Sequence, residues 1–382
     1  MGRSFYEFFA GGGMARLGLG SGWECLFAND FDAKKAASYR ANFSGAPELR
    51  VGDIAKLTTS DLPGRADLAW ASFPCQDLSL AGNGKGLNGE RSGTFWAFWR
   101  LMLGLAQEGR APKIICLENV YGLLTSHGGA DFRAICEALV EGGYRVGAML
   151  IDAALFVPQS RLRLFVVAVR NNVEFPDACV SSKPQSLFHP QALTAAYSAL
   201  PLKLRSNWLW WRLPTAPMRN LAFADIVEDQ PEGVEWHSRE QTARLLAMMS
   251  PANLAKVQAA QMKRRRIVGA LYKRTRREDG VKHQRAEVRF DDVSGCLRTP
   301  GGGSSRQSII VVKGEKIRTR LLSPREAARL MGLPEDYVLP ERYNDAYHLA
   351  GDGVATPAVR HLAENLFGPL LAARAPKHAK AA

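Results

Sequence analysis

Short apolar segments alternate with amphipathic ones along the first half of the chain. The apolar segments have the length of buried strands, and the stretches between them repeat apolar residues at helical spacing. On this basis we predict strands at 4–9, 25–28, 67–73, 113–117, 144–151 and 164–169. Helices are predicted between them, for example over 94–108 and 132–141. This alternation is typical of an α/β fold with a mostly parallel sheet, whose ligands bind at the carboxyl ends of the strands.

The regular alternation ends near residue 175, where a stretch rich in proline, serine and tryptophan begins. Further along, a helix is predicted over 323–331, with Ser323 as its N-cap and Glu326 completing a capping box. The change of pattern predicts two domains. The larger domain spans residues 1–175 and is completed by 340–382, and the smaller one spans 176–339.

The charge balance favours a polyanionic partner. The 382 residues include 50 Lys and Arg against 37 Asp and Glu, a net charge of +13. Two runs of cations, 263–266 and 273–277, with Tyr272 beside the second, fit contacts to nucleic-acid phosphates. A basic surface that is merely solvated is the alternative interpretation.

Cysteine and hydrophobic patterns narrow the class of protein further. The six cysteines show no CxxC spacing and no clustering with histidine, so we expect neither a metal site nor a disulfide framework. No apolar run approaches the ~18 residues of a membrane span, and no signal peptide is visible. These features predict a cytoplasmic protein.

Glycines and acids follow the first predicted strands. Gly11, Gly12 and Gly13 would bring backbone N–H groups close to a ligand, although Arg16 breaks the dinucleotide-binding spacing. Asp30, after the second strand, could bind ribose hydroxyls or cap the next helix. Beside it, Phe31 could stack on an adenine, and Asp53 could accept from an adenine amino group or cap a turn.

Candidate catalytic residues follow the later strands. Pro74 fixes the chain where Cys75 leaves a strand, which suits a nucleophile, although most such cysteines are inert. Glu118 ends an apolar strand and is costly to desolvate without a partner or a task. Arg161 and Arg163 lie on one face of an extended segment, where they could also be a solvated strand edge.

These motifs, in this order, resemble those of the DNA cytosine-5 methyltransferases of prokaryotic type, over nearly the whole chain. The matching segments are Phe9-Ala10-Gly11, Asn29–Asp32, Gly52-Asp53-Ile54, Phe73-Pro74-Cys75-Gln76 with Ser79, Glu118-Asn119-Val120, Gln159–Arg163 and Arg320–Gly332. The resemblance implies a Rossmann-like S-adenosylmethionine-dependent methyltransferase domain with a mostly parallel sheet, plus a smaller mixed target-recognition domain. It also implies a monomer acting on duplex DNA, with a separately acting restriction endonuclease as a candidate partner.

The resemblance also assigns roles to single residues. Cys75 would attack carbon 6 of a flipped-out cytosine, and Glu118 would hold nitrogen 3 and the exocyclic amine. Arg163 would hold the carbonyl oxygen at carbon 2, with Arg161 supporting the site or the thiolate. The residues implied for S-adenosylmethionine are Phe9, Ala10, Gly11, Gly12, Gly13, Met14, Asp30, Phe31, Asp53, Ile54, Pro74, Phe95, Asp352 and Val354.

The chain departs from the family pattern at several positions. Glu7 stands where the family usually has aspartate, and the glycine turn has a third glycine in a row. Asp30 replaces a more frequent glutamate and Phe31 a more frequent tryptophan. Near the end, Asp352-Gly353 replaces Asn-Ser, which adds a carboxylate and removes a hydroxyl where the resemblance places the methionine part of the cofactor.

Other functions fit parts of the sequence. An RNA (tRNA) cytosine-5 methyltransferase could use the same motifs, although the long basic region favours duplex DNA. A nicotinamide-dependent oxidoreductase would explain the glycine turn and Asp30 but would leave Cys75 and Glu118 without a task. A catalytically silent DNA-binding relative would not need Cys75.

Overall fold

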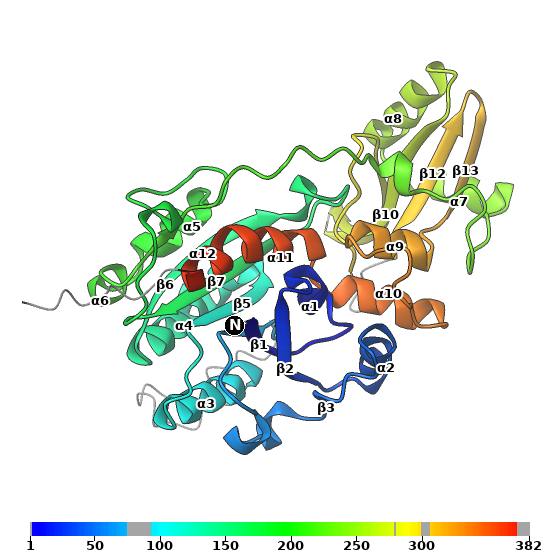
Figure 1. The fold of residues 1–382 in the computed structure, drawn as a ribbon. Coiled ribbons are helices and arrows are strands. Elements are labelled where there is room, and N and C mark those ends of the chain that lie inside the picture. Colours follow the sequence, from blue (N-terminus) through cyan, green and yellow to red (C-terminus); the bar gives the residue numbers. More distant parts are fainter. Residues whose placement is uncertain (1, 75–92, 279, 299–305, 373–382) are drawn as a thin grey trace, which may run out of the picture. The chain divides into compact units, whose positions relative to one another are not determined.

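The computed structural model of the chain describes residues 2–74, 93–278, 280–298 and 306–372 (Figure 1). Contacts between Cα atoms divide the chain into two compact units. Unit 1 comprises Met1–Ile151, Leu162–Ala216 and Ala358–Ala382, and unit 2 comprises Asp152–Arg161 and Pro217–Pro357.

Unit 1 is built on a seven-stranded sheet with the strand order β3-β2-β1-β4-β5-β7-β6. Its strands are β1 (Arg3–Phe8), β2 (Trp23–Asp30), β3 (Leu49–Val51), β4 (Leu68–Ala71), β5 (Ile114–Val120), β6 (Tyr144–Asp152) and β7 (Leu162–Arg170). β1 to β5 pair in parallel and β7 runs antiparallel to β5, which confirms the predicted α/β fold with a mostly parallel sheet. The order of the strands reverses between β1 and β4, which is where ligands bind in such sheets.

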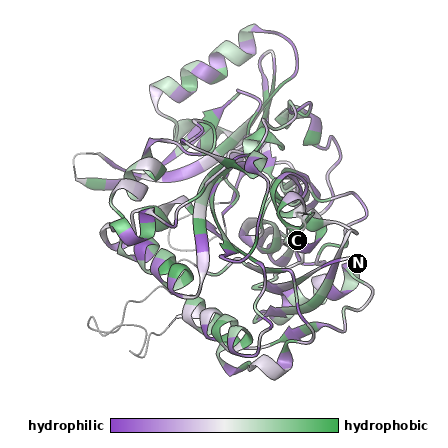
Figure 2. Cartoon of the chain, turned by 60° about the vertical axis from the view of Figure 1, so that its left-hand side comes forward, coloured by the Kyte–Doolittle hydropathy of each residue, from purple (hydrophilic) through white to green (hydrophobic). Residues whose placement is uncertain are grey.

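Helices of unit 1 pack their apolar faces on this sheet. They are α1 (Met14–Leu19), α2 (Ala33–Asn42), α3 (Thr94–Gln107), α4 (Ala130–Glu141), α5 (Gln191–Ser198), α6 (Leu202–Arg205), α11 (Thr356–Leu362), which begins at the boundary of the unit, and α12 (Gly368–Ala372). Figure 2 shows hydrophobic and hydrophilic residues alternating along the helices, as expected for elements with one buried face.

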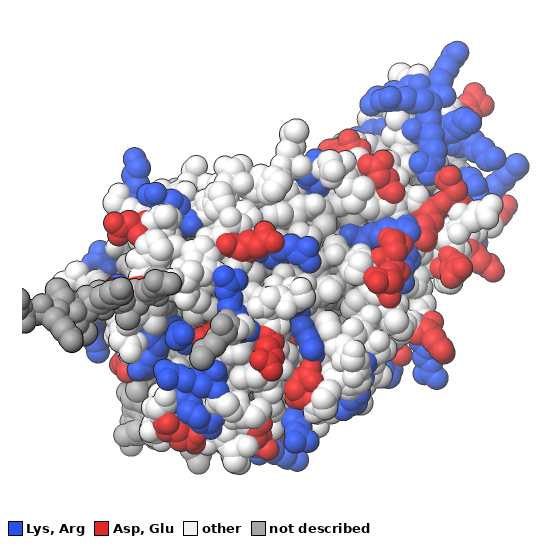
Figure 3. All heavy atoms as spheres, in the orientation of Figure 1, with Lys and Arg blue, Asp and Glu red and all other residues white. Residues whose placement is uncertain are grey.

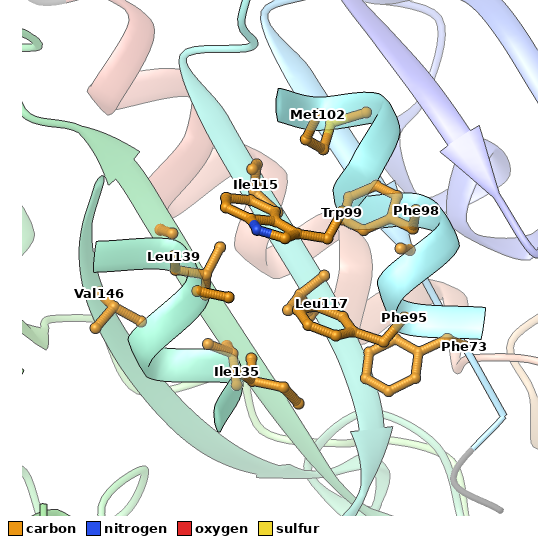
Figure 4. Close-up of a cluster of buried hydrophobic side chains, with 14 of the residues drawn as sticks. Phe73, Phe95, Phe98, Trp99, Met102, Ile115, Leu117, Ile135, Leu139 and Val146 are labelled. Atoms are coloured by element: carbon orange, nitrogen blue, oxygen red, sulfur yellow. The ribbon is translucent and has the colours of Figure 1, made fainter. Parts of the chain in front are cut away.

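One core cluster lies between α3, α4 and the sheet. α3 directs Phe95, Phe98 and Trp99 into it, where they meet Ile115 and Leu117 of β5 (Figure 4). Each such side chain contributes roughly 1.5–3 kcal/mol by burial. The aromatic residues of α3 therefore serve mainly to hold the helix on the sheet.

The boundaries of the units differ from the predicted ones at 175 and 340. The tryptophan-rich stretch belongs to unit 1, because Trp208 lies in its core and Trp211 donates from Nε1 to the Val167 carbonyl at 3.1 Å. Residues 340–357 belong to unit 2, where the Tyr343 hydroxyl donates to the Leu322 carbonyl at 2.9 Å. Tryptophans that the sequence pattern suggested to be a second domain are thus part of the first.

Unit 2 contains a four-stranded antiparallel sheet with the order β11-β10-β12-β13. Its strands are β10 (Ile267–Glu278), β11 (Val281–Arg289), β12 (Ser308–Lys313) and β13 (Lys316–Leu321). Its main helices are α7 (Arg239–Ala247), α8 (Pro251–Met262), α9 (Pro324–Leu330) and α10 (Tyr343–Asp352). The predicted helix after Ser323 is confirmed, with its capping box, whereas the long β10–β11 hairpin was not predicted. Within the described residues, no helix is long and apolar enough to cross a membrane.

Candidate active site

The turn after β1 has a backbone that requires glycine at two positions for different reasons. Gly11 has a φ of +55°, and a Cβ there would meet no atom within 4 Å, so this side of the turn is open to a ligand. Gly13 has a φ of +78°, and a Cβ there would lie 2.3 Å from the Phe43 ring. The third glycine therefore serves packing. Phe9, with a φ of 57°, holds an unfavourable left-handed conformation at the same turn.

Asp30 fastens this turn to the end of β2. Its carboxylate accepts from the Gly11 N–H at 2.7 Å and from the Asp32 N–H at 2.8 Å. Burial raises the pKa of Asp30. The N-cap of α2 is Asp32, which accepts from the Lys34 N–H. Of the two predicted roles, capping the helix therefore falls to Asp32, and binding ribose hydroxyls stays the prediction for Asp30. Each Asp30 oxygen keeps a further lone pair for a ligand hydroxyl.

The other predicted cofactor residues of unit 1 fall into two groups. Phe31 is exposed, at 78%, and so offers an open ring, and Asp53 is exposed but also caps a turn through the Ala55 N–H at 2.9 Å. In contrast, the side chains of Met14, Ile54 and Phe95 are buried. Their cofactor contacts stay predictions, but their packing already explains their apolar character.

Asn29 was missed by the sequence reasoning, although it belongs to the same motif as Asp30. Its amide donates to the Arg50 carbonyl at 2.9 Å and to the Gly52 carbonyl at 3.0 Å. It thereby fixes the chain leaving β3 beside the end of β2. The signal for this role in the sequence was an amide side chain directly after the predicted strand 25–28.

Glu7 is buried beneath the glycine turn. One of its oxygens accepts from the Arg16 N–H at 3.2 Å and the other from the Tyr39 hydroxyl at 3.0 Å. Burial raises the pKa of Glu7 to about 7 despite these donors. The extra methylene relative to aspartate lets the carboxyl group reach both α1 and α2.

We expect Glu7→Gln to change how stability depends on pH. The unfolded chain releases the Glu7 proton near pH 4.5 and the native protein only near pH 7. Between these values the native state binds more protons, so its unfolding free energy falls as pH rises, by about 3 kcal/mol for this group. Glutamine removes that fall. Urea unfolding from pH 4.5 to 8 measures it as the difference between wild type and variant.

The matched control for this experiment is Glu24→Gln, which changes an exposed glutamate on the neighbouring strand. Its difference from wild type should stay constant over the same pH range. A wild-type-minus-E7Q difference that is equally flat would contradict the buried-glutamate interpretation.

The structure brings Glu118 and Arg163 together. Because β7 runs antiparallel to β5, Glu118 lies opposite Phe165 and Val120 opposite Arg163. The two charged side chains therefore lie diagonally on one face of the sheet. Arg163 Nε is 3.2 Å from Glu118 Oε1, with side chains that are 15% and 7% exposed. This is the partner that a glutamate in an apolar strand needs.

Asn119 joins this pair to the end of β4. Its side-chain amide donates to the Phe73 carbonyl at 2.9 Å, one residue before Pro74. Pro74 is exposed. Cys75 lies outside the described residues, so its role as a nucleophile stays a prediction. The described part of the site is thus a Glu–Arg pair whose strand is tied to the backbone that leads to Cys75.

Arg161 has a different environment from Arg163. It belongs to unit 2, its side chain is 2% exposed, and its guanidinium donates to three carbonyls and to the Cys296 sulfur. The three carbonyls are those of Leu297 at 3.0 Å, Gly351 at 2.8 Å and Gly353 at 2.7 Å. The alternative of a solvated edge is wrong for this residue. Its position shows that it holds the segment that carries Asp352, which is exposed, and leads to Val354, which is buried.

Among the residues that the structure describes, no group of three or more His, Cys, Asp or Glu side chains could hold a metal ion.

Comparisons with known proteins cover nearly the whole chain. The model of the family described as C-5 cytosine-specific DNA methylase matches residues 3–368. The chain is 29% identical to the Type II methyltransferase M.Bsp6I of Bacillus sp. (strain RFL6), over 95% of this chain and 98% of the relative. It is 26% identical to the Type II methyltransferase M.HhaI of Haemophilus parahaemolyticus, over 97% and 95%.

The fold is similar to that of the S. pombe Dnmt2 methyltransferase, whose crystal structure gives a TM-score of 0.57 at 17% identity and covers 97% of this chain and 99% of that one. The family match takes in the sheet of unit 1, the Glu118–Arg163 pair and all of unit 2. It shows that the chain belongs to the C-5 cytosine-specific DNA methylases and is an enzyme that methylates carbon 5 of cytosine in DNA.

Proposed function

We propose that the enzyme transfers the methyl group of S-adenosylmethionine to a flipped-out cytosine in a specific duplex sequence, through a covalent adduct between Cys75 and carbon 6. The observation that carries this proposal is the Glu118–Arg163 pair at the end of β5, joined by Asn119 to the backbone before Cys75. An oxidoreductase would have no use for this arrangement.

The pair complements one edge of cytosine. This edge presents the exocyclic amine, nitrogen 3 and the carbonyl oxygen at carbon 2 in a row. Glu118 can accept from the amine with one oxygen and share a proton with nitrogen 3 through the other. Arg163 beside it can donate to the carbonyl oxygen. Thymine presents a carbonyl oxygen in place of the amine, so the Glu118 oxygen that accepts from the amine would face another acceptor.

These contacts act where charge develops during the reaction. When the Cys75 thiolate bonds to carbon 6, the electron pair of the 5,6 double bond moves through the ring toward nitrogen 3 and the carbonyl oxygen. Glu118 and Arg163 hold these two atoms and so stabilise the nucleophilic ring. Carbon 5 would then bond to the methyl group while the bond between that group and the donor sulfur breaks, with sulfur keeping the electron pair. The carbon 5 proton is then lost to a base, and the thiolate leaves as the 5,6 double bond returns.

The residues after β1 and β2 fit the proposed cofactor. S-adenosylmethionine supplies an electrophilic methyl group when it is bound. The open ring of Phe31 would stack on its adenine, and Asp30 would accept from its ribose hydroxyls. The open side of Gly11 leaves room for close approach of a ligand to the backbone. Asp30 would thus bind both the turn and the ligand that the turn carries.

Duplex DNA is the proposed substrate. Because carbon 5 cannot be attacked inside a stacked helix, the enzyme must extrude the base. Relatives carry the name Type II methyltransferase, which fits a role in restriction and modification. A separate endonuclease that cuts the same unmethylated sequence is the corresponding partner. Bisulfite sequencing of DNA from cells that express the chain would reveal the methylated sequence.

We expect Cys75→Ala to abolish methyl transfer while DNA and S-adenosylmethionine still bind. Without the thiolate, carbon 5 of cytosine is too weak a nucleophile to attack the methyl group. Transfer of labelled methyl groups to duplex DNA and, in parallel, to tRNA measures the loss and separates the DNA enzyme from the RNA alternative. Preferred transfer to tRNA would replace duplex DNA as the substrate.

The matched control is Cys179→Ala, because burial raises the pKa of the Cys179 thiol and keeps it protonated. This variant should transfer methyl groups at close to the wild-type rate. Full activity of Cys75→Ala would exclude the covalent mechanism. DNA that contains 5-fluorocytosine provides a second test, because fluorine cannot leave as a cation and the wild-type adduct should accumulate.

A further inference from the structure

The β10–β11 hairpin of unit 2 extends beyond its own sheet. β12 pairs with β10 only from Ile267 to Leu271, whereas β11 pairs with it as far as Glu278. Residues 272–278 and 281–287 therefore form a two-stranded ribbon, which within the described residues is bridged only at its base, where Met249 pairs with Ala286. At about 3.4 Å per residue, the ribbon projects roughly 20 Å.

This ribbon concentrates positive charge that destabilises it in isolation. Lys and Arg side chains gather over this end of unit 2 (Figure 3). Three of its cross-strand pairs juxtapose basic residues: Arg274 with Arg285, Arg276 with His283, and Arg277 with Lys282. Like charges directly opposite each other are unfavourable, and Glu or Thr would protect the edge strand without this cost. A polyanion would relieve the repulsion.

The two faces of the ribbon differ in the contacts that their side chains make. On one face, Glu287 accepts from Arg276 Nε at 2.7 Å and pairs with Arg274 at 3.7 Å, and the Arg274 guanidinium lies 4.8 Å from the Tyr272 ring centroid. We call this the braced face. Its arginines are held in place by an acid and an aromatic ring.

The opposite side, which we call the open face, carries Thr275, Arg277, Lys282 and Gln284 near the tip. All four are exposed, and none makes a side-chain hydrogen bond or ion pair within the described part of the chain. Nearer the base of the ribbon, the same face packs Leu271, Ala286 and Val288 into the core of unit 2. The direction of the open face is thus fixed by core packing where the ribbon leaves the sheet. Near the tip, the face presents four polar side chains that make no hydrogen bond or ion pair within the described residues.

We propose that this ribbon enters the major groove of the substrate duplex, with the open face toward the base edges. The inference rests on the proposed DNA substrate and identifies the element that reads it. The major groove, about 12 Å wide, admits a two-stranded ribbon. Arginine and lysine pair with guanine there and glutamine pairs with adenine, so the open face carries groups that distinguish base pairs. On DNA without the recognised sequence, Arg277 and Lys282 at the tip contact phosphates instead of guanine.

Two double variants separate affinity from readout. Arg277→Ala with Lys282→Ala removes the cations of the open face. We expect affinity for random-sequence 40-base-pair duplexes to fall by on the order of tenfold, and the slope of log affinity against log salt to decrease by about 2. Lys313→Ala with Lys316→Ala removes two exposed cations at the opposite end of the same sheet and should change both quantities much less. Equal effects of the two pairs, or an unchanged slope in the first, would overturn the proposal.

Thr275→Ala with Gln284→Ala removes the neutral groups of the open face. The salt slope should stay at the wild-type value, while bisulfite sequencing of methylated plasmid DNA should reveal a broader set of sites, with discrimination at one or more positions falling about tenfold. An unchanged set of sites would exclude base readout by this face. An RNA duplex has a groove too narrow for the ribbon, so equally strong ribbon-dependent binding to RNA would also overturn the proposal.

These measurements remain decisive if the proposed function fails. DNA binding and its salt slope do not require methyl transfer, so a wild-type protein that binds through the ribbon but methylates no DNA would contradict the proposed function alone. A wild-type protein that methylates DNA while the variants bind and select sites normally would contradict the ribbon alone. Thermal unfolding of each variant, expected within about 2 °C of wild type for exposed positions, shows that the fold is intact.

Discussion

Glu118→Gln is expected to lower the rate of methyl transfer by roughly 10²- to 10⁴-fold, the range of a lost general acid. Glutamine keeps the size of the side chain and an acceptor for the exocyclic amine, but it cannot supply a proton to nitrogen 3. Because Arg163 and the strand remain, affinity for DNA should stay close to wild type. Single-turnover transfer to duplex DNA measures the chemical step, and equilibrium binding measures the affinity.

The control for this variant is Glu137→Gln, in which a half-buried glutamate of α4 loses its charge beside Arg133, 3.7 Å away. It should retain wild-type turnover. If Glu118→Gln also turns over normally, the carboxyl group has no role at nitrogen 3, and the Glu118–Arg163 pair is structural. A loss of DNA affinity equal to the loss of rate would instead place Glu118 in binding of the ground state.

The sheet of unit 1 could be predicted because its strands are short apolar runs separated by helical patterns. The same reasoning placed Glu118 at a strand end but could not pair it with Arg163. That contact depends on β7 running antiparallel beside β5, and the direction of a strand leaves no mark in its hydrophobic pattern. The resemblance to a family named both residues, whereas the strand register explains why they meet.

The predicted domain boundary differs from the boundary of the compact units for a related reason. Tryptophans without periodicity suggested an irregular second domain, but Trp211 is completely buried against β7. Long-range packing of single aromatic residues outweighs local pattern, so it cannot be read from neighbouring residues. Arg161 illustrates the same limit, since its carbonyl partners lie more than a hundred residues away in the sequence.

The ribbon of unit 2 was recognised only as a run of cations. Residues 273–277 contain almost no apolar positions, so period-two alternation, the usual signal of a strand, is missing. Their extended conformation comes from pairing with β11, which is equally polar near the tip. Composition predicted the chemistry of this segment correctly as basic, while its shape required the structure.

Arg320→Ala is expected to destabilise the protein by about 3 to 5 kcal/mol, the cost of leaving a buried charge without its partner. The Arg320 and Glu326 side chains are 0% exposed, and two parallel hydrogen bonds of 2.7 and 2.6 Å join them. Glu326 also accepts from the Ser323 N–H at 2.7 Å, so the pair ties β13 to the first turn of α9. Urea unfolding of the full-length chain, followed by far-ultraviolet circular dichroism, measures the loss.

Arg318→Ala provides the matched control, because Arg318 is on the same strand and also lies over the Trp236 ring, at 3.9 Å, but is exposed. A loss within about 1 kcal/mol is expected there. Replacing both members, Arg320→Met with Glu326→Gln, leaves no buried charge and should recover part of the stability, while the shared cap of α9 prevents full recovery. If Arg320→Ala is as mild as Arg318→Ala, the buried pair does not hold α9 to the sheet. A large loss confined to Arg320 would show that the capping box visible in the sequence is held in place by an arginine that its spacing does not reveal.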